Sequence, residues 1–155
     1  MAIEIERRFL VDSSTIPFSE YPHTRIIQGY LPNGNSKVVT RIRVVDNDEA
    51  QLCVKGEKVL GSGVEFEYPI PLEDAYGLLE LCEATVMKDR YYISGDSDLT
   101  WEVDVFLDSH ENLVIAEVEL EDIDVDLGKI PFPVIREITD QHEFSNFQLA
   151  HKTGA

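Results

Sequence analysis

Charged and apolar side chains alternate along several segments of this 155-residue chain. In the first segment, Glu4, Glu6 and Arg8 lie on one side of an extended backbone, whereas Ile5 and Phe9 lie on the other. Arginine and lysine suit phosphate oxygens, and carboxylates without a partnering histidine or cysteine suit a hard cation such as Mg²⁺ or Mn²⁺. A surface that carries both kinds of side chain favours a metal-bound polyphosphate as its ligand.

The same two-sided pattern recurs in most of the segments that read as strands. Six of the 13 basic residues and eight carboxylates occupy the charged side. In a chain with a formal charge of −17, random placement would not gather the cations so strongly. A charged face that is simply solvated, as in many antiparallel sheets, stays open as the alternative. The positions are Arg8, Arg41, Arg43, Lys55, Lys88 and Arg90, with Glu4, Glu6, Glu65, Glu67, Glu102, Asp104, Glu117 and Glu119.

The alternation predicts eight strands joined by short turns into an antiparallel meander. Eight such strands can close into a barrel whose apolar side faces outward and whose charged side lines a lumen. We therefore expect a β-dominated α+β fold, an eight-stranded antiparallel β-barrel formed as a single domain over residues 1–155. The expected strands are 3–11, 24–31, 36–45, 49–58, 63–69, 85–94, 99–107 and 113–120.

Two helices are expected to pack outside this barrel. Residues 72–82 carry a helical stripe of apolar side chains, formed by Ala75, Leu78, Leu79 and Cys82. A shorter helix is expected over residues 145–151, and residues 121–132 are expected to form an acidic loop.

Composition excludes several classes of protein. The strong negative charge argues against binding to nucleic acid or to an anionic membrane surface. The two cysteines, Cys53 and Cys82, form no CxxC pair, so neither a disulfide framework nor a zinc knuckle is expected. The first residues alternate in charge instead of forming the apolar run of a signal peptide, and no stretch is long enough to span a membrane. A cytoplasmic protein is expected.

The charged segments resemble the motifs of the CYTH superfamily, the triphosphate tunnel metalloenzymes. Residues 4–10, EIERRFL, are similar to the N-terminal ExExK signature, and RxR at 41–43, VKG at 54–56, KxRY at 88–91 and ExE at 117–119 follow in the family's order. The resemblance implies an eight-stranded tunnel that binds a triphosphate through basic residues and a divalent metal through acidic ones. Two positions depart from the pattern: Arg8 stands where the signature has Lys, and Glu143 where an Arg is common.

The resemblance also implies a role for each site residue. Lys88 and Tyr30 look like the catalytic Lys–Tyr dyad of the short bacterial tripolyphosphatases, with Tyr30 orienting Lys88. The metal, Mg²⁺ or Mn²⁺, is expected on one set of carboxylates, with Asp104 helping to place a second ion. The expected metal ligands are Glu4, Glu6, Asp104, Glu117 and Glu119, and the expected substrate-binding residues are Arg8, Arg41, Arg43, Lys55 and Arg90.

These roles predict a metal-dependent hydrolase, an inorganic triphosphatase that releases phosphate from short linear polyphosphate such as tripolyphosphate. The expected partner is thus a small molecule, and a homodimer is left open. Three other kinds of protein would share these motifs or the same phosphate-binding residues. They are a class IV-type adenylate cyclase, a thiamine triphosphatase and a non-enzymatic polyphosphate-binding module. Intact Asp104 and Lys88 argue against the last of these.

Overall fold

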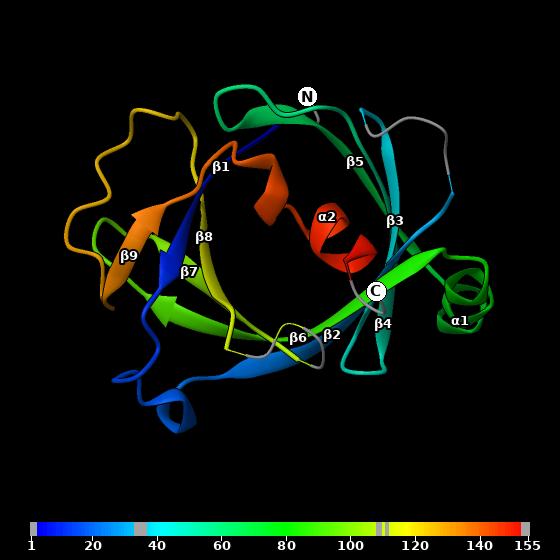
Figure 1. Ribbon diagram of the computed structural model, residues 1–155, viewed down its shortest axis with the longest axis horizontal. Helices are drawn as coiled ribbons and strands as arrows, with labels where there is room; N and C mark the ends of the chain where they lie inside the picture. Colours follow the sequence, from blue (N-terminus) through cyan, green and yellow to red (C-terminus); the bar gives the residue numbers. More distant parts are fainter. Residues whose placement is uncertain (1–2, 33–36, 108–109, 111, 153–155) are drawn as a thin grey trace.

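The protein folds as a closed antiparallel β-barrel, described by a computed structural model over residues 3–32, 37–107, 110 and 112–152 (Figure 1). The sheet order is β5–β4–β3–β2–β6–β7–β8–β1–β9, and pairing of β5 with β1 closes the ring. The expected eight-stranded barrel is therefore confirmed. Its strands are β1 (Ile3–Val11), β2 (His23–Tyr30), β3 (Val39–Val45), β4 (Glu49–Lys55), β5 (Ser62–Ile70), β6 (Ala84–Ser94), β7 (Thr100–Phe106) and β8 (Val114–Glu119).

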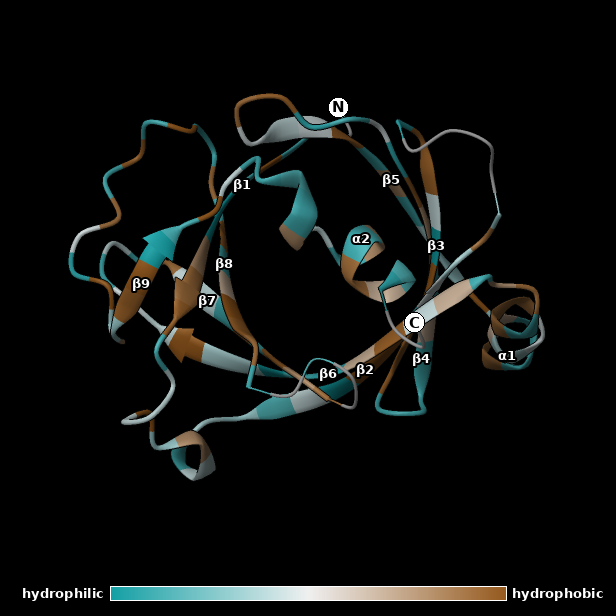
Figure 2. Cartoon of the chain, in the orientation of Figure 1, coloured by the Kyte–Doolittle hydropathy of each residue, from teal (hydrophilic) through white to brown (hydrophobic). Residues whose placement is uncertain are grey.

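The strand register brings the charged positions of neighbouring strands together. Arg90 of β6 lies opposite Asp104 of β7, and Arg8 of β1 lies opposite Glu117 of β8. Because side chains alternate between the two faces of a strand, these pairs share the inner face. The ribbons of the wall accordingly carry both hydrophilic and hydrophobic bands (Figure 2). The expected start of the third strand at residue 36 lies outside the described residues.

A ninth strand, β9 (Val134–Glu137), lies beside the barrel (Figure 1). It pairs with the second half of β1, because β5 pairs only with Ile3–Ile5 on that edge. The sequence did not predict it. Only Val134 of its four residues is even partly buried, so β9 lacks the alternation that marks the other strands.

Apolar residues on the outer wall are covered from two sides. The helix α1 (Leu72–Glu80) packs its buried Ala75 against Ile42 and Val44, as expected for a helix outside the barrel. The loop of residues 121–133 places Leu127 and Phe132 in a second cluster around Trp101. The expected acidic loop thus also acts as a cover for β7 and β8.

The second helix, α2 (Asn146–His151), fills one end of the barrel, which corrects the expectation that all helices pack outside (Figure 1). Its buried Leu149 and Ala150 pack against Val86, Phe106 and Ile115. The inner face is apolar at this end, so without α2 these side chains would face water. Short 3₁₀ helices lie at Phe18–Glu20 and His142–Phe144. Among the described residues, no helix has the length and apolar character needed to cross a membrane.

Candidate active site

The inner face of the barrel surrounds a cavity of about 760 Å³. Every residue expected in the site lines it except Lys88 and Asp104, which are fully buried in the wall. Basic and acidic side chains contribute together, as the sequence predicted. The basic residues are Arg8, Lys37, Arg41, Arg43, Lys55, Lys58 and Arg90, and the acidic residues are Glu4, Glu6, Glu49, Glu57, Glu65, Glu67, Glu102, Glu117, Glu119 and Asp140.

Two of the arginines retain unused hydrogen-bond donors. Arg8 bonds Glu117 at 3.2 Å and the carbonyl oxygen of Phe144 at 2.9 Å, and Arg41 bonds Glu67 at 3.3 Å. Within the described part of the chain, the Nη2 atom of Arg8 and the Nε atom of Arg41 are buried without a hydrogen-bond partner. A buried donor is costly unless an acceptor reaches it, so both atoms favour an anionic ligand with several oxygens.

Arg43 belongs to a short hydrogen-bonded chain that runs through the buried Gln28 to Tyr30, another residue of the cavity lining. Its Nε donates to Gln28 at 3.0 Å, and the amide nitrogen of Gln28 donates to the Tyr30 hydroxyl at 3.0 Å. Burial together with repulsion from Arg41 and Arg90 lowers the pKa of Arg43 to about 10. Such crowding of like charges is relieved when an anion lies between the guanidinium groups.

Arg90 is held by three carboxylates of the neighbouring strands β7 and β8. It forms two bonds with Asp104, of 2.7 and 2.9 Å, and contacts Glu102 at 3.0 Å and Glu117 at 3.6 Å. Bidentate pairing of this kind fixes the direction of the guanidinium group. Arg90 is therefore preorganised at the cavity wall.

Lys88 lies behind Arg90 with no exposure to solvent. Its ammonium contacts Asp104 at 2.7 Å and donates to Asn146 of α2 at 3.1 Å. Burial lowers the pKa of Lys88 to about 7, since Asp104 is shared with Arg90 and compensates only part of the lost hydration. Tyr30, which was expected to orient Lys88, accepts a hydrogen bond from Gln28, and among the described residues the hydrogen bond of the Lys88 side chain goes to Asn146.

The carboxylates crowd together at the other side of the cavity. Burial and repulsion from Glu4 and Glu102 raise the pKa of Glu119 to about 7. Burial and repulsion from Glu117 raise the pKa of Glu6. Carboxylates held this close favour a cation between them.

The divalent cation that the resemblance implies fits this part of the cavity. Glu4, Glu6, Glu117 and Glu119 supply the oxygen ligands that a hard cation prefers. Asp104 fits less well in this arrangement, because both of its oxygens are engaged by Arg90 and Lys88.

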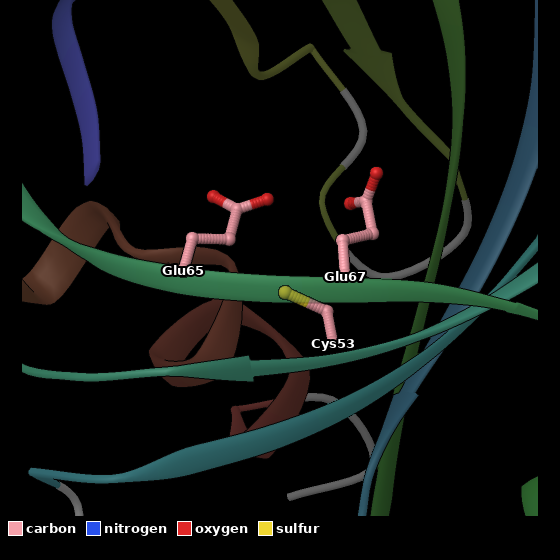
Figure 3. A group of neighbouring side chains, drawn as sticks. All are labelled: Cys53, Glu65 and Glu67. Atoms are coloured by element: carbon pink, nitrogen blue, oxygen red, sulfur yellow. The ribbon is translucent and has the colours of Figure 1, made fainter. Parts of the chain in front are cut away.

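Among the described residues, one group of three potential ligand atoms lies within 4.8 Å of one another: Cys53, Glu65 and Glu67 (Figure 3). The two glutamates project from one side of β5, with Cys53 on the adjacent strand. Burial raises the pKa of Cys53 to about 11, so the sulfur remains a thiol, and Arg41 engages Glu67. A hard cation is better served by the four-carboxylate set.

Three cavity features were missed from the sequence. Lys37 and Lys58 line the cavity, and both lie outside the strands of the structure, because β3 begins at Val39 and β4 ends at Lys55, whereas the expected strands reached residues 36 and 58. Asn146 begins α2, the helix that was expected outside the barrel. The Ser-Asn pair at 145–146 was the available signal, since Ser145 caps α2 through a bond from the Gln148 amide.

Comparisons with known proteins identify relatives of the whole chain and its family. The chain is 39% identical to the inorganic triphosphatase of Acetivibrio thermocellus over 150 residues, which cover 96% of this chain and 94% of that protein. The structure of the inorganic triphosphatase NE1496 is 30% identical with a TM-score of 0.67, covering 95% and 97% of the two chains. HpAC1 from Hippeastrum, 15% identical with a TM-score of 0.60 over 79% and 80% of the chains, shares the fold. The CYTH domain model matches residues 2–143, and the chain belongs to the CYTH domain family.

Proposed function

We propose that the protein is a metal-dependent hydrolase that releases phosphate from inorganic tripolyphosphate or a similarly short linear polyphosphate. The main support for this proposal is that arginines, lysines and four carboxylates, Glu4, Glu6, Glu117 and Glu119, line one cavity. The relative that is 39% identical over nearly the whole chain is an inorganic triphosphatase, which supports the same activity here. The free cysteines Cys53 and Cys82 agree with a cytoplasmic location.

The basic residues bind the phosphate chain in this proposal. Arg8 and Arg41 direct their unused donors to phosphoryl oxygens, which relieves the cost of burying them. Arg43, Lys55 and Arg90 add positive charge along the same cavity. Because α2 fills one end of the barrel, the substrate enters from the other end.

The carboxylates Glu4, Glu6, Glu117 and Glu119 hold the divalent cation, Mg²⁺ or Mn²⁺. When bound, the cation supplies charge neutralisation to the phosphoryl group that is transferred. The proposed contribution of Asp104 to a second metal requires that Arg90 or Lys88 release one of its oxygens. Phosphoryl transfer depends mainly on positioning and electrostatics, which a rigid charged wall provides.

Lys88 is the proposed catalytic residue. Its buried ammonium, held by Asp104 and Asn146, orients the attacking water or stabilises the departing phosphate. Tyr30, the other member of the proposed dyad, acts on the site through Gln28 and Arg43 as the side chains stand.

The test is a phosphate-release panel over tripolyphosphate, pyrophosphate, ATP and thiamine triphosphate, each with Mg²⁺ and with Mn²⁺. Tripolyphosphate should be hydrolysed fastest, because the cavity offers ionic contacts along its length. Faster turnover of ATP, or cyclic AMP as a product, would assign a nucleotide activity instead. Fastest turnover of thiamine triphosphate would assign that substrate, and tight tripolyphosphate binding without phosphate release would leave only a binding module.

A further inference from the structure

Lys58 lies in the hairpin between β4 and β5 and reaches into the carboxylate set. Its ammonium contacts Glu4 Oε1 at 2.5 Å and also contacts Glu6 Oε1. We propose that Lys58 is an internal counter-cation, which occupies the Glu4–Glu6 pair in the metal-free protein, leaves it when the metal binds, and then pairs with a substrate phosphate. This inference rests on the proposed function for the identity of the metal site.

The carboxylate pair cannot hold the ammonium and the metal in the same way at the same time. Mg²⁺ binds carboxylate oxygens at about 2.0–2.1 Å and requires near-octahedral geometry. The Lys58 ammonium lies directly on the Oε1 atoms of Glu4 and Glu6. Since both cations are positive and need the same oxygens, binding of one disfavours binding of the other.

The neighbouring Lys55 is less suited to this exchange. Its ammonium lies 3.3 Å from Glu4 and 3.6 Å from Glu65, so it already forms ion pairs with carboxylates of two strands, β1 and β5. It is also the last residue of β4, where the strand ladder fixes its backbone. Among the described residues, the ion pairs of Lys58 are confined to Glu4 and Glu6.

The hairpin backbone can remain in place while the Lys58 side chain moves. The Gly61 amide donates to both carboxylate oxygens of Asp140 at 2.9 Å, and the Gly61 carbonyl accepts from the Glu6 amide at 3.0 Å. Gly61 has a φ of +78°, and a Cβ there would lie 2.7 Å from the Glu6 carbonyl oxygen. The hairpin is thus tied to β1, and rotation of the flexible lysine stem suffices for the exchange.

Two opposite effects follow from the loss of Lys58. The metal no longer competes with an ammonium, so metal binding in the absence of substrate tightens. The substrate loses one cationic partner, so tripolyphosphate binding weakens. A purely structural lysine would not produce this pair of opposite changes.

The first experiment compares Mg²⁺ binding to wild type and Lys58→Met by calorimetry without substrate. We expect the Kd to fall at least about five-fold, the lower end of typical coupling between sites. Lys129→Met is the matched control, because it removes the same charge from an exposed position outside the cavity. An unchanged or higher Kd for Lys58→Met, or an equal fall for Lys129→Met, would overturn the proposal.

The second experiment uses the wild-type protein and does not depend on a variant that folds. Lysines are acetylated with and without Mg²⁺, and modification is read by mass spectrometry. Labelling of Lys58 should rise with Mg²⁺, whereas the fully buried Lys88 should stay protected. Labelling of Lys58 that stays constant or falls would contradict the exchange. Phosphate release tests the proposed function separately, since Lys58 can be displaced by the metal whether or not tripolyphosphate is hydrolysed.

Discussion

The ammonium of Lys88 lies 2.7 Å from Oδ2 of Asp104, and both residues are fully buried. Arg90 binds the same carboxylate through two bonds. The Asp104 carboxylate is therefore shared by two buried cations, and Arg90 also contacts Glu102 and Glu117. Within the described residues, the ion pair of Lys88 is confined to this shared carboxylate, so negative charge that develops on a phosphate chain during reaction is a partner that its ammonium favours.

This arrangement predicts that substitution of Lys88 and substitution of Lys55 change different kinetic constants. Lys88→Ala should lower kcat at least about 100-fold, because general acid–base or electrostatic roles contribute about 10²–10⁴-fold. Lys55→Ala should mainly raise KM, since a residue that holds phosphate equally in the ground and transition states contributes binding alone. Steady-state kinetics on tripolyphosphate measures both. Wild-type kcat with a raised KM in Lys88→Ala would show that Lys88 is not catalytic.

The hydrogen-bonded chain from Tyr30 through Gln28 to Arg43 gives a second prediction. Tyr30→Phe should raise KM by about 2- to 10-fold, the value of a neutral hydrogen bond, with a smaller change in kcat than Lys88→Ala produces. Gln28→Met should do the same, and the double variant should be little worse than Gln28→Met, because the two residues act through one chain. Additive effects on KM would show that Tyr30 acts by another route.

The inner charged face could be predicted from the sequence because strand geometry converts period-two alternation directly into a choice of face. Arg41 and Arg43 share one face with Lys55 for that reason, and all three line the cavity. Within the expected strand 49–58, alternation puts Lys58 on the side opposite Lys55, but β4 ends at Lys55 and the turn that follows brings Lys58 to the cavity, so Lys58 was missed.

The position of α2 could not be predicted by the same argument. A short helix with apolar residues such as Leu149 can cover the outer wall or fill the lumen, and its sequence does not distinguish the two. The position of α2 inside the barrel depends on Val86, Phe106 and Ile115, which make one end of the inner face apolar. The bond from Lys88 to Asn146 depends on that position as well.

Two glycines near α1 form a matched pair for stability. At Gly29 of β2, a Cβ would lie 2.7 Å from the Cys82 sulfur and 2.9 Å from Leu79 Cδ2, so Gly29→Ala should destabilise the fold by about 1–3 kcal/mol through overpacking. At Gly77, inside α1, an added Cβ meets nothing within 4 Å among the described residues. Gly77→Ala should stabilise by about 0.5–1 kcal/mol. Urea unfolding measures both, and destabilisation by Gly77→Ala or stabilisation by Gly29→Ala would contradict the packing of α1.

The ion pair between Arg7 and Glu137 links β1 to β9, and its contribution to stability should depend on pH. The hydrogen bond from Arg7 lowers the pKa of Glu137 in the folded protein. The stabilisation is therefore present above the pKa that Glu137 has in the unfolded chain, and it is lost as the pH falls through the pKa in the folded protein. Glu137→Gln should lower the free energy of unfolding at pH 7 by less than about 1 kcal/mol, since the pair is partly exposed. The difference from wild type should shrink below about pH 4.

Urea unfolding at pH 7 and pH 3 measures this dependence. Glu143→Gln is the control, because it removes the same charge from an exposed site in the 3₁₀ helix His142–Phe144, outside the pairing of β1 with β9. A difference for Glu137→Gln that grows as the pH falls would show that the pair does not stabilise β9.

Release of phosphate from tripolyphosphate by the purified wild-type protein, with Mg²⁺ and then with excess EDTA, tests the central claim most directly. The carboxylates that line the cavity repel a triphosphate unless a divalent cation intervenes. We predict steady release with Mg²⁺, loss of release in EDTA, and recovery when Mg²⁺ is restored. Undiminished release in EDTA would contradict the metal-dependent mechanism, and no release with either Mg²⁺ or Mn²⁺ would contradict the proposed activity.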